Sequence, residues 1–358
     1  MSLTITRPDD WHVHLRDGAM LKQVAVYTAR QFTRALVMPN LSPPIETVKQ
    51  ALAYRTRILD AVPASLNFDP KMTLYLTENT SPKQIKEAAD CEHVLGFKLY
   101  PSGATTNSKF GVTRITSMMN IFECMAKYDV CMQIHGEVTD PNVDVFDREA
   151  VFIEQVLDTV HREIPEFRMT LEHITTRHGI DFVKQCSTNI AGTITPQHLM
   201  YNRNEMFKSG IRPHHFCLPV LKREEHRMAL LEAATSGDPS FFLGTDSAPH
   251  TRNSKESACG CAGIFSAVAA IEYYAEMFDG IDKIDRLEGF ASHFGADYYR
   301  LPRNTEQITL IRKAKTIPRA IPSCHASISE QEIVPLKAGE GLSWSLEEKP
   351  EPRTGIRN

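Results

Sequence analysis

Short runs of apolar and β-branched residues alternate with longer amphipathic stretches along most of the chain. Runs of this kind predict strands, which we expect at residues 3–14, 35–39, 72–76, 94–100, 130–135, 168–173, 190–195 and 241–245. Apolar positions at helical spacing, mixed with charges, predict helices at residues 47–59, 82–89, 115–127, 147–160, 177–185 and 223–234. Strands that alternate with helices are typical of an α/β protein with a parallel sheet covered by helices.

The number of predicted strands favours a closed (β/α)8 TIM barrel, because with about eight strands the side chains fill the interior. An open doubly wound sheet is the alternative. Such a sheet usually has a glycine-rich turn after its first strand, and Asp17-Gly18-Ala19 does not match that pattern. The alternation ends near residue 303. We therefore expect one domain over residues 1–358, with a peripheral C-terminal segment over about 304–358 whose end, from residue 347, is poorly ordered.

Composition narrows the class of protein. The 358 residues are 42% hydrophobic and 23% charged, with a net charge of −4, which is ordinary for a globular chain. The mildly acidic balance argues against a nucleic-acid partner, and the longest apolar run, near residues 261–271, is too short to span a membrane. Charges among the first twenty residues argue against a secretory leader, so we expect a cytoplasmic protein whose eight cysteines are reduced. Of these, Cys259 and Cys261 alone cannot complete a tetrahedral zinc site.

Polar residues interrupt the predicted strands at particular positions. His12 and His14 are two residues apart, so on a strand both imidazoles project from one face, which favours a metal site. Lys98 lies within the apolar run at residues 94–100, where a buried charge is costly unless it is paired or neutralised. A lysine that reaches solvent at the end of the strand, a Schiff-base amine and a lysine carbamate all remain open for this residue.

Three further candidates end predicted strands: His135, His173 and Asp246, with His250 four residues after Asp246. In a barrel the carboxyl ends of the strands meet at one opening, where the active sites of such folds are found. Together with His12, His14 and Lys98, these residues would therefore converge. The other histidines fall in loops or predicted helices. For His198, His214 and His215 the sequence does not decide between a surface and a buried position. The other six are expected at the surface: His93, His161, His178, His226, His293 and His325.

At these residues the chain resembles the dihydroorotases of the amidohydrolase superfamily, specifically the short single-domain bacterial type. The matching motifs lie at residues 7–18, 37–40, 98–101, 105–107, 135–137, 172–176, 195–198, 217–219 and 244–250, and the resemblance covers most of residues 3–300. His-x-His alone is only a superfamily signal, whereas Arg16 and the Thr-Asp-Ser-Ala-Pro-His run at 245–250 are specific. Many amidohydrolases add a small β-domain built from both termini. Only eleven residues precede His12, so we expect no such domain here.

The resemblance implies a binuclear metal centre at the C-terminal mouth of the barrel. His12, His14 and Asp246 would hold one ion, and His135 and His173 the other. Lys98, modified by CO2 to N6-carboxylysine, would bridge the two. The ions are divalent and in the family usually zinc, which suits imidazole and carboxylate ligands, although other divalent ions would fit the same ligands.

The same resemblance implies the reaction and the substrate contacts. The reaction is the reversible cyclisation of N-carbamoyl-L-aspartate to L-dihydroorotate in pyrimidine (UMP) biosynthesis. It would proceed by attack of a metal-bound hydroxide, with Asp246 as general acid and base. Arg16, Asn40 and His250 are expected to bind the substrate carboxylate. The backbones of Leu218 and Ala262 are expected to contact the ring, and the loop with Thr105 and Thr106 to close over the substrate. A homodimer is expected from the family.

Two rival functions remain. A hydantoinase or a phosphotriesterase-like hydrolase could use the same metals, but neither needs the carboxylate set of Arg16, Asn40 and His250. A non-catalytic barrel that has lost its metals should lack ligands, and this chain retains the full set.

Overall fold

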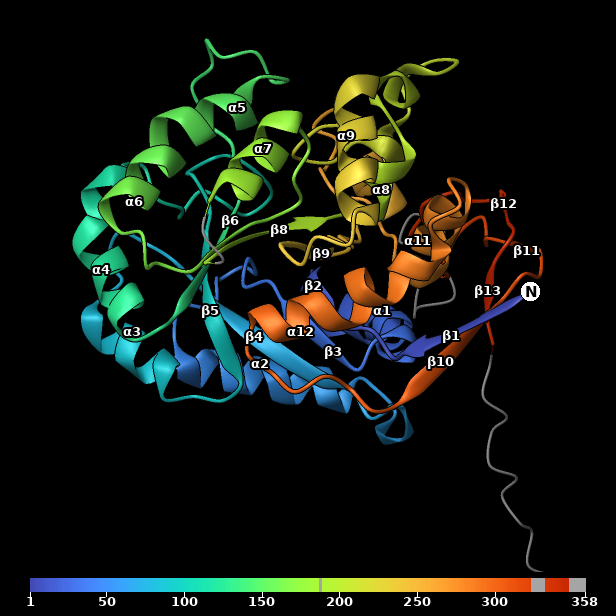
Figure 1. Cartoon of the computed structure of the whole chain (residues 1–358), viewed down its shortest axis with the longest axis horizontal. Helices are drawn as coiled ribbons and strands as arrows, with labels where there is room; N and C mark the ends of the chain where they lie inside the picture. Colours follow the sequence, from blue (N-terminus) through green and yellow to red (C-terminus); the bar gives the residue numbers. More distant parts are fainter. Residues whose placement is uncertain (187–188, 323–331, 348–358) are drawn as a thin grey trace, which may run out of the picture.

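Eight parallel strands form the barrel at the centre of the computed structural model, which describes residues 1–186, 189–322 and 332–347 (Figure 1). Their order follows the sequence: β2 Asp10–Val13, β3 Arg34–Val37, β4 Asp69–Tyr75, β5 Val94–Leu99, β6 Cys131–Ile134, β7 Met169–Leu171, β8 Ile190–Ile194 and β9 Phe241–Leu243. The last strand closes on the first, since the backbone N–H of Asp246 donates to His12 O at 2.8 Å and that of His14 to Ser247 O at 3.0 Å. The predicted (β/α)8 barrel is confirmed.

Helices surround the strands on the outside of the barrel, as Figure 1 shows. They are α1 Gly18–Gln31, α2 Val48–Asp60, α3 Pro82–Ala89, α4 Met119–Lys127, α5 Arg148–Phe152, α6 Asp158–Glu163, α7 Arg177–Gln185, α8 Pro196–Met200, α9 Glu224–Thr235, α10 Arg252–Lys255, α11 Ala270–Asp279 and α12 Phe294–Tyr298. The predicted helices at 82–89 and 177–185 have the predicted ends, and those at 47–59 and 223–234 are shifted by one residue. The helix predicted at 115–127 starts with a 3-10 turn before α4, and the one predicted at 147–160 is interrupted by a π-helical turn between α5 and α6. Ser81 and Gln84 form a reciprocal capping box that fixes the start of α3.

The amino-terminal end of the barrel is closed by aromatic packing. Trp11 on β2 stacks on Tyr299, directly after α12, with ring centroids 4.7 Å apart, and meets Phe242 of β9 edge-on. Gly295 lies against the Trp11 ring so closely that a Cβ there would come within 2.0 Å of it. Because this end is filled, a ligand can reach the barrel interior only from the carboxyl ends of the strands.

The predicted strand at residues 3–14 is wrong in its extent. It is two strands, β1 Ser2–Thr6 and β2, separated by Pro8, which has no N–H to donate to a ladder. Only β2 belongs to the barrel. β1 pairs antiparallel with β10 Gln307–Ile311, which pairs with β13 Ser345–Leu346, and Figure 1 shows β1 and β10 side by side beyond the barrel. The expectation that the two termini build no β-layer is therefore wrong. The five residues of β1 are enough to contribute one strand to a three-stranded sheet with β10 and β13.

The described part of the C-terminal segment packs against the barrel through short strands. Besides β10 and β13 it contains β11 Lys315–Thr316 and β12 Gly341–Leu342. Trp344 is fully buried, and its indole N–H donates to Asp279 at the end of α11 at 3.1 Å. The residues from 348 onward, predicted to be poorly ordered, and His325 lie outside the described residues.

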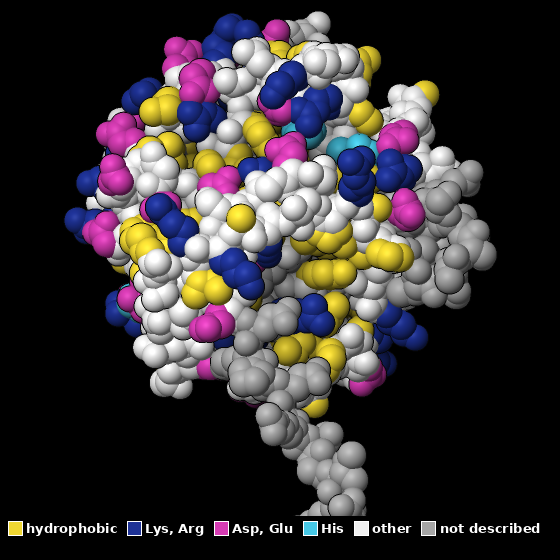
Figure 2. Space-filling view, turned by 90° about the vertical axis from the view of Figure 1, so that its right-hand side faces the viewer, with side chains coloured by type: hydrophobic (Ala, Val, Ile, Leu, Met, Phe, Trp, Pro, Cys, Tyr) yellow, Lys and Arg dark blue, Asp and Glu magenta, His cyan; other side chains and the backbone are white. Residues whose placement is uncertain are grey.

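Surface charges of both signs are interspersed on the face shown in Figure 2, with apolar side chains gathered near its centre. The described part of this face offers no continuous basic surface. In the described ranges, none of the helices is both long and apolar enough to cross a lipid bilayer.

Candidate active site

The carboxyl ends of the barrel strands surround a cavity that opens to solvent. Its walls bring together residues from nearly every predicted group: His12, His14, Arg16, Asn40, Tyr100, Thr105, Thr106, His135, His173, Leu218, Asp246, Ala248, Ala262 and Gly263. Among the predicted site residues, Lys98 and His250 do not line it. Lys98 is fully buried, and His250 contacts the wall residues Arg16 and Ala262.

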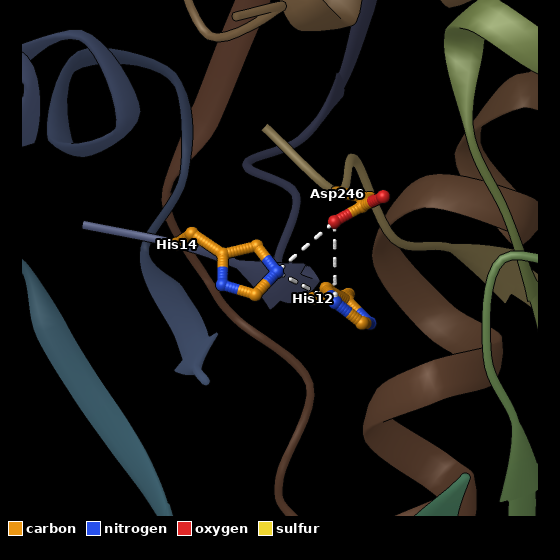
Figure 3. A group of neighbouring side chains, drawn as sticks. All are labelled: His12, His14 and Asp246. Atoms are coloured by element: carbon orange, nitrogen blue, oxygen red, sulfur yellow. Dashed lines mark hydrogen bonds and ion pairs between the residues drawn. The ribbon is translucent and has the colours of Figure 1, made fainter. Parts of the chain in front are cut away.

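Three side chains converge on one point of this cavity, as Figure 3 shows for His12, His14 and Asp246. The Oδ1 atom of Asp246 lies 3.1 Å from His14 Nε2 and 3.4 Å from His12 Nε2, and the two Nε2 atoms are 3.4 Å apart. All the potential ligand atoms lie within 4.8 Å of one another. This spacing and this donor set, two imidazoles and a carboxylate, are what a divalent ion such as zinc requires.

Hydrogen bonds to the Nδ1 atoms of His12 and His14 fix the orientation of both imidazoles. His12 Nδ1 lies 2.8 Å from Glu172 Oε2, which also accepts from Thr193 Oγ1 at 2.6 Å. His14 Nδ1 lies 2.8 Å from Asn40 Oδ1. With the Nδ1 protons donated to these oxygens, the Nε2 lone pairs face the cavity, which is the arrangement found behind histidine ligands of metals.

A second pair of histidines lies beside the first group. The rings of His135 and His173 have centroids 4.8 Å apart, and His173 lies 5.0 Å from the His12 ring. His135 Nε2 is 2.8 Å from Glu137 Oε2, so its Nδ1 is the atom left for a ligand, while the buried Nδ1 of His173 has no hydrogen-bond partner among the described residues. The pair thus offers two more unengaged nitrogens.

Backbone strain accompanies these positions. His173, Asp246 and Arg16 have φ angles of 40°, 45° and 58°, in the left-handed region that side chains rarely adopt. Non-glycine residues are held in this region when surrounding structure overrides the local preference, which is common at functional sites.

Lys98 on β5 is the most unusual group beneath the cavity. Its side chain is fully buried, and its Nζ has no hydrogen-bond partner among the described residues. Burial lowers the pKa of this amine to about 8, although the charges of Glu172 and Asp246 oppose the shift. The reading of Lys98 as a residue that reaches solvent is therefore wrong. An amine with a lowered pKa and no partner is suited to covalent modification.

The carboxyl of Asp246 has the opposite character. Burial raises its pKa, but the hydrogen bond from His14 and the charges of His12, His14 and Lys98 outweigh that effect and bring the pKa to about 2. Asp246 is therefore an anion at neutral pH. Burial, with the Lys98 charge next, lowers the pKa of His12 and His173, so both are neutral and able to act as ligands.

The predicted carboxylate-binding residues lie at the rim of the same cavity. Arg16 Nε donates to Pro249 O at 3.0 Å, and its Nη2 lies 3.0 Å from His250 Nε2. Arg16 has no ion pair among the described residues, so this half-buried guanidinium has no carboxylate partner within the described protein. The positive charge can therefore be matched by an anionic ligand.

The loop of residues 101–112 is tied to the rim on the other side. Asn40 Nδ2 donates to Thr106 O at 3.1 Å, Asn107 Nδ2 donates to Asn40 O at 3.0 Å, and Thr106 Oγ1 donates to Ala262 O at 3.4 Å. The predicted loop residues thus lie against the predicted backbone contact. A merely solvated loop does not account for these bonds.

Sequence reasoning missed the residues that hold the ligands in place. Glu172 precedes His173 and Glu137 follows His135 by two positions, so both could have been found as carboxylates beside candidate ligands. His198, which was left open, is buried between Thr195 Oγ1 at 2.7 Å and Pro219 O at 3.0 Å. Of the histidines expected at the surface, His178 is exposed, and the other described ones are half-buried: His93, His161, His226 and His293.

Buried neutral histidines predict that the metal-free protein loses stability in mild acid. Burial is the largest cause that lowers the pKa of His198 to about 4, of His215 to about 3 and of His250 to about 2. The unfolded chain binds these protons at about pH 6.5, so the buried histidines should lower the free energy of unfolding as the pH drops below that value. Asp10 and Glu172, whose carboxyl pKa values burial raises to about 7, oppose part of this effect, because they take up protons in the folded protein first. The slope is about 1.4 kcal/mol per pH unit for each histidine.

Urea unfolding of chelator-treated protein near pH 7 and about pH 5 measures this effect. His198→Gln should reduce the slope, whereas His178→Gln, at an exposed site, should leave it unchanged. Equal stability of the unmodified protein at both pH values would contradict the prediction.

Comparison with known proteins places this geometry in a family. Residues 7–318 match the amidohydrolase family model. A dihydroorotase of Synechocystis is 56% identical over 344 residues, 96% of this chain and 99% of the relative, and one of Laribacter hongkongensis is 56% identical over 346 residues, 96% and 99%. The structure of dihydroorotase from Campylobacter jejuni is similar with a TM-score of 0.88, 34% identity and coverage of 97% and 98%.

Two further solved structures show how far the similarity in sequence and in fold extends. A yeast dihydroorotase in complex with 5-fluoroorotic acid has a TM-score of 0.88 and 31% identity, covering 98% of this chain and all of its own. An L-hydantoinase from Arthrobacter aurescens has a TM-score of 0.74 at 16% identity, with coverage of 96% and 83%. The hydantoinase therefore shares the fold alone.

Proposed function

The chain belongs to the dihydroorotases of the amidohydrolase family, and from this premise we propose how its residues interconvert N-carbamoyl-L-aspartate and L-dihydroorotate in pyrimidine biosynthesis. One observation carries the proposal. The convergent group of His12, His14 and Asp246 lines the same cavity as Arg16, whose guanidinium has no ion pair among the described residues. A hydrolytic centre next to a carboxylate-binding group suits a substrate that is both a cyclic amide and an anion. A hydantoinase, whose substrate needs no such group, is disfavoured.

The ligands fit two divalent ions, most simply zinc. His12, His14 and Asp246 would hold one, and His135 and His173 the other, because all four imidazoles present an unengaged nitrogen or one aimed into the cavity. When bound, such ions make water a nucleophile near neutral pH and polarise a carbonyl oxygen. The metals are the part of this proposal that elemental analysis of the purified protein tests directly.

Lys98 would connect the two ligand groups as a carbamate. The neutral amine adds to CO2 through a new N–C bond and releases one proton, which leaves an anionic carbamate whose oxygens can act as ligands. Burial, which lowers the amine pKa to about 8, favours the neutral form that reacts. The modification also removes a buried cation that has no hydrogen-bond partner among the described residues. We prefer it to a Schiff base because the carbonyls of this substrate are those of amides and a carboxylate.

Asp246 would move the proton. In hydrolysis its carboxylate accepts a proton from the attacking water and passes it to the amide nitrogen as the C–N bond breaks. In ring closure the same carboxyl returns the proton to the departing oxygen. As a proposed metal ligand, Asp246 would be a carboxylate in the resting site and so could accept this proton.

The remaining cavity residues would bind the substrate. Arg16 would bind its carboxylate, assisted by Asn40 and His250, and the backbones of Leu218 and Ala262 would contact the edge of the ring. The loop that carries Thr105 and Thr106 would exclude water while the ring opens or closes. The analogue 5-fluoroorotic acid, a ligand of the yeast relative, should bind here as well.

Dihydroorotate hydrolysis, followed by ultraviolet absorbance, tests the function as a whole. We expect turnover that is lost with a chelator and returns with zinc; a protein that binds zinc but does not consume dihydroorotate would refute it. By analogy with the family we also propose a homodimer in the cytoplasm, which light scattering and cell fractionation would test.

Replacing Arg16 by methionine should weaken substrate binding without loss of metal. Truncating a charge-paired group costs about 2–5 kcal/mol, so the KM for dihydroorotate should rise by about 30-fold or more. Zinc content, measured by elemental analysis, should not change, because a guanidinium cannot act as a ligand.

Arg55→Met is the matched control. Arg55 donates to Asp69 and Pro70 at the amino end of β4, away from the cavity. Its replacement should leave KM unaltered. The assignment of Arg16 fails if Arg16→Met loses zinc or retains the unmodified KM.

A further inference from the structure

One buried lysine outside the proposed metal site, Lys255, donates its hydrogen bonds to backbone oxygens and lies 5.7 Å from the centre of the Phe216 ring. Lys255, at the end of α10, is 2% exposed, and its Nζ donates to the carbonyls of Phe216, Cys261 and Gly263, each at 2.7 Å. No ion pair to Lys255 is found in the described ranges of the chain. Three carbonyl oxygens use all three protons of an ammonium group, so the buried charge is solvated by the backbone rather than by a carboxylate.

The three carbonyls belong to two segments far apart in sequence. Cys261 and Gly263 flank Ala262, and Phe216 lies two residues before Leu218. The segments also touch directly, because the backbone N–H of Gly263 donates to Phe216 O at 3.0 Å. Lys255 therefore lies at the junction of the two backbones.

Both segments form the wall of the cavity opposite the histidines. Leu218 and Ala262 line it, and among the described residues neither backbone N–H has a hydrogen-bond acceptor. The carbonyl of Ala262 is already engaged by Thr106 Oγ1 at 3.4 Å and lies 2.9 Å from His250 Nε2. Two lining residues thus have a backbone N–H without an acceptor among the described residues, and the separation of these two groups depends on how the segments are joined.

We propose that Lys255 is a positioning residue for substrate recognition, whose ammonium holds residues 216–218 and 261–263 at the spacing that lets the Leu218 and Ala262 backbones contact the pyrimidine ring. The inference rests on the proposed function, since it takes the cyclic amide as the ligand of that wall. Lysine is suited to this task because three N–H groups radiate from one atom. A neutral side chain of similar length cannot satisfy all three carbonyls.

Lys255→Met tests the proposal, because methionine fills similar space without donors. In the zinc-loaded enzyme we expect the KM for dihydroorotate and the Kd for 5-fluoroorotic acid, measured by calorimetry, to rise by about tenfold or more, the scale of a misplaced binding group. The kcat should change by less than about threefold, and zinc content should stay the same, since Lys255 touches no proposed metal ligand.

Lys71→Met is the matched control. Lys71 is another buried lysine, 8% exposed, but it lies near the amino end of β4 and pairs with Asp69 at 3.1 Å. Its replacement should lower the melting temperature and leave KM and Kd unchanged. If Lys255→Met does the same, Lys255 has only a structural role and the proposal is overturned.

Lys255→Gln keeps the test decisive if the methionine variant fails to fold. Its amide can donate to two of the three carbonyls, so KM and Kd should lie between those of the unmodified enzyme and the tenfold change. Unchanged values in this variant would also overturn the proposal. This test of Lys255 is separate from the test of the proposed function. If the wild-type enzyme hydrolyses dihydroorotate, the proposed function holds whatever the Lys255 variants do.

Discussion

Replacing Lys98 with alanine is expected to remove nearly all activity in both directions. The proposed carbamate supplies anionic oxygens between two groups of proposed ligands. Loss of the shared ligand should cost several kcal/mol of transition-state stabilisation, a fall in kcat/KM on the order of 10³-fold or more. Because only oxygens are missing, acetate or propionate together with zinc should restore part of the rate.

Two companion measurements separate the carbamate from the other roles of a lysine. Lys98→Arg keeps the positive charge but cannot form the carbamate, so it should be as inactive as the alanine variant. Labelled bicarbonate should give a carbamate carbon signal in the NMR spectrum of the wild-type protein and none in the spectrum of either variant. Lys71→Ala, at the opposite end of the barrel, should keep its activity.

The bridging role would be excluded by substantial activity of the alanine variant without any added acid. A Schiff base makes a different prediction. Borohydride added during turnover would then leave a covalent adduct on Lys98, detectable by mass spectrometry.

Much of the site could be predicted because its ligands lie at positions that the fold dictates. The alternation of strands and helices placed His135, His173 and Asp246 at strand ends, and strand ends in a barrel meet at one opening. The two-residue spacing of His12 and His14 predicted that both imidazoles face the same way, and their Nε2 atoms are 3.4 Å apart. These inferences needed only the period of a strand and the direction of the sheet.

The remaining features depend on contacts that carry no pattern in the sequence. β1 looked like the start of the first barrel strand because its residues are equally apolar, and only pairing with β10, about 300 residues away, shows that it lies outside the barrel. Lys255 could not be identified either, because all its partners are backbone carbonyls, which every residue has. Backbone partners of this kind appear only once the chain is folded.

Exchange of Asp246 for asparagine is the second change with a large expected effect. The amide has the size of the carboxyl and keeps one oxygen as a weak ligand, but it cannot carry a proton at any accessible pH. Loss of a positioned acid and base costs about 10²–10⁴-fold in rate. The equilibrium constant is a property of the reactants, so at each pH hydrolysis and ring closure must lose kcat/KM by the same factor.

The pH dependence follows from the proton balance. Hydrolysis releases one proton and ring closure takes one up, so rising pH favours N-carbamoyl-aspartate by about tenfold per unit. Asp246 is a proposed metal ligand, so we expect its carboxylate to be present in the resting enzyme throughout the neutral range. We therefore expect the hydrolytic rate to rise with pH and the closure rate to fall, with apparent pKa values that belong to the coupled site as a whole.

Forward and reverse kcat/KM across pH, for unmodified enzyme and Asp246→Asn at saturating zinc, provide the measurement. Zinc content is determined on the same samples, since Asp246 is also a proposed ligand, and a variant that has lost its metal would be inactive for that reason alone. The informative sample is therefore one that retains zinc beside His12 and His14. If that sample keeps more than about a tenth of the unmodified kcat/KM in either direction, Asp246 is a metal ligand only, and the proton must travel by another group or through water.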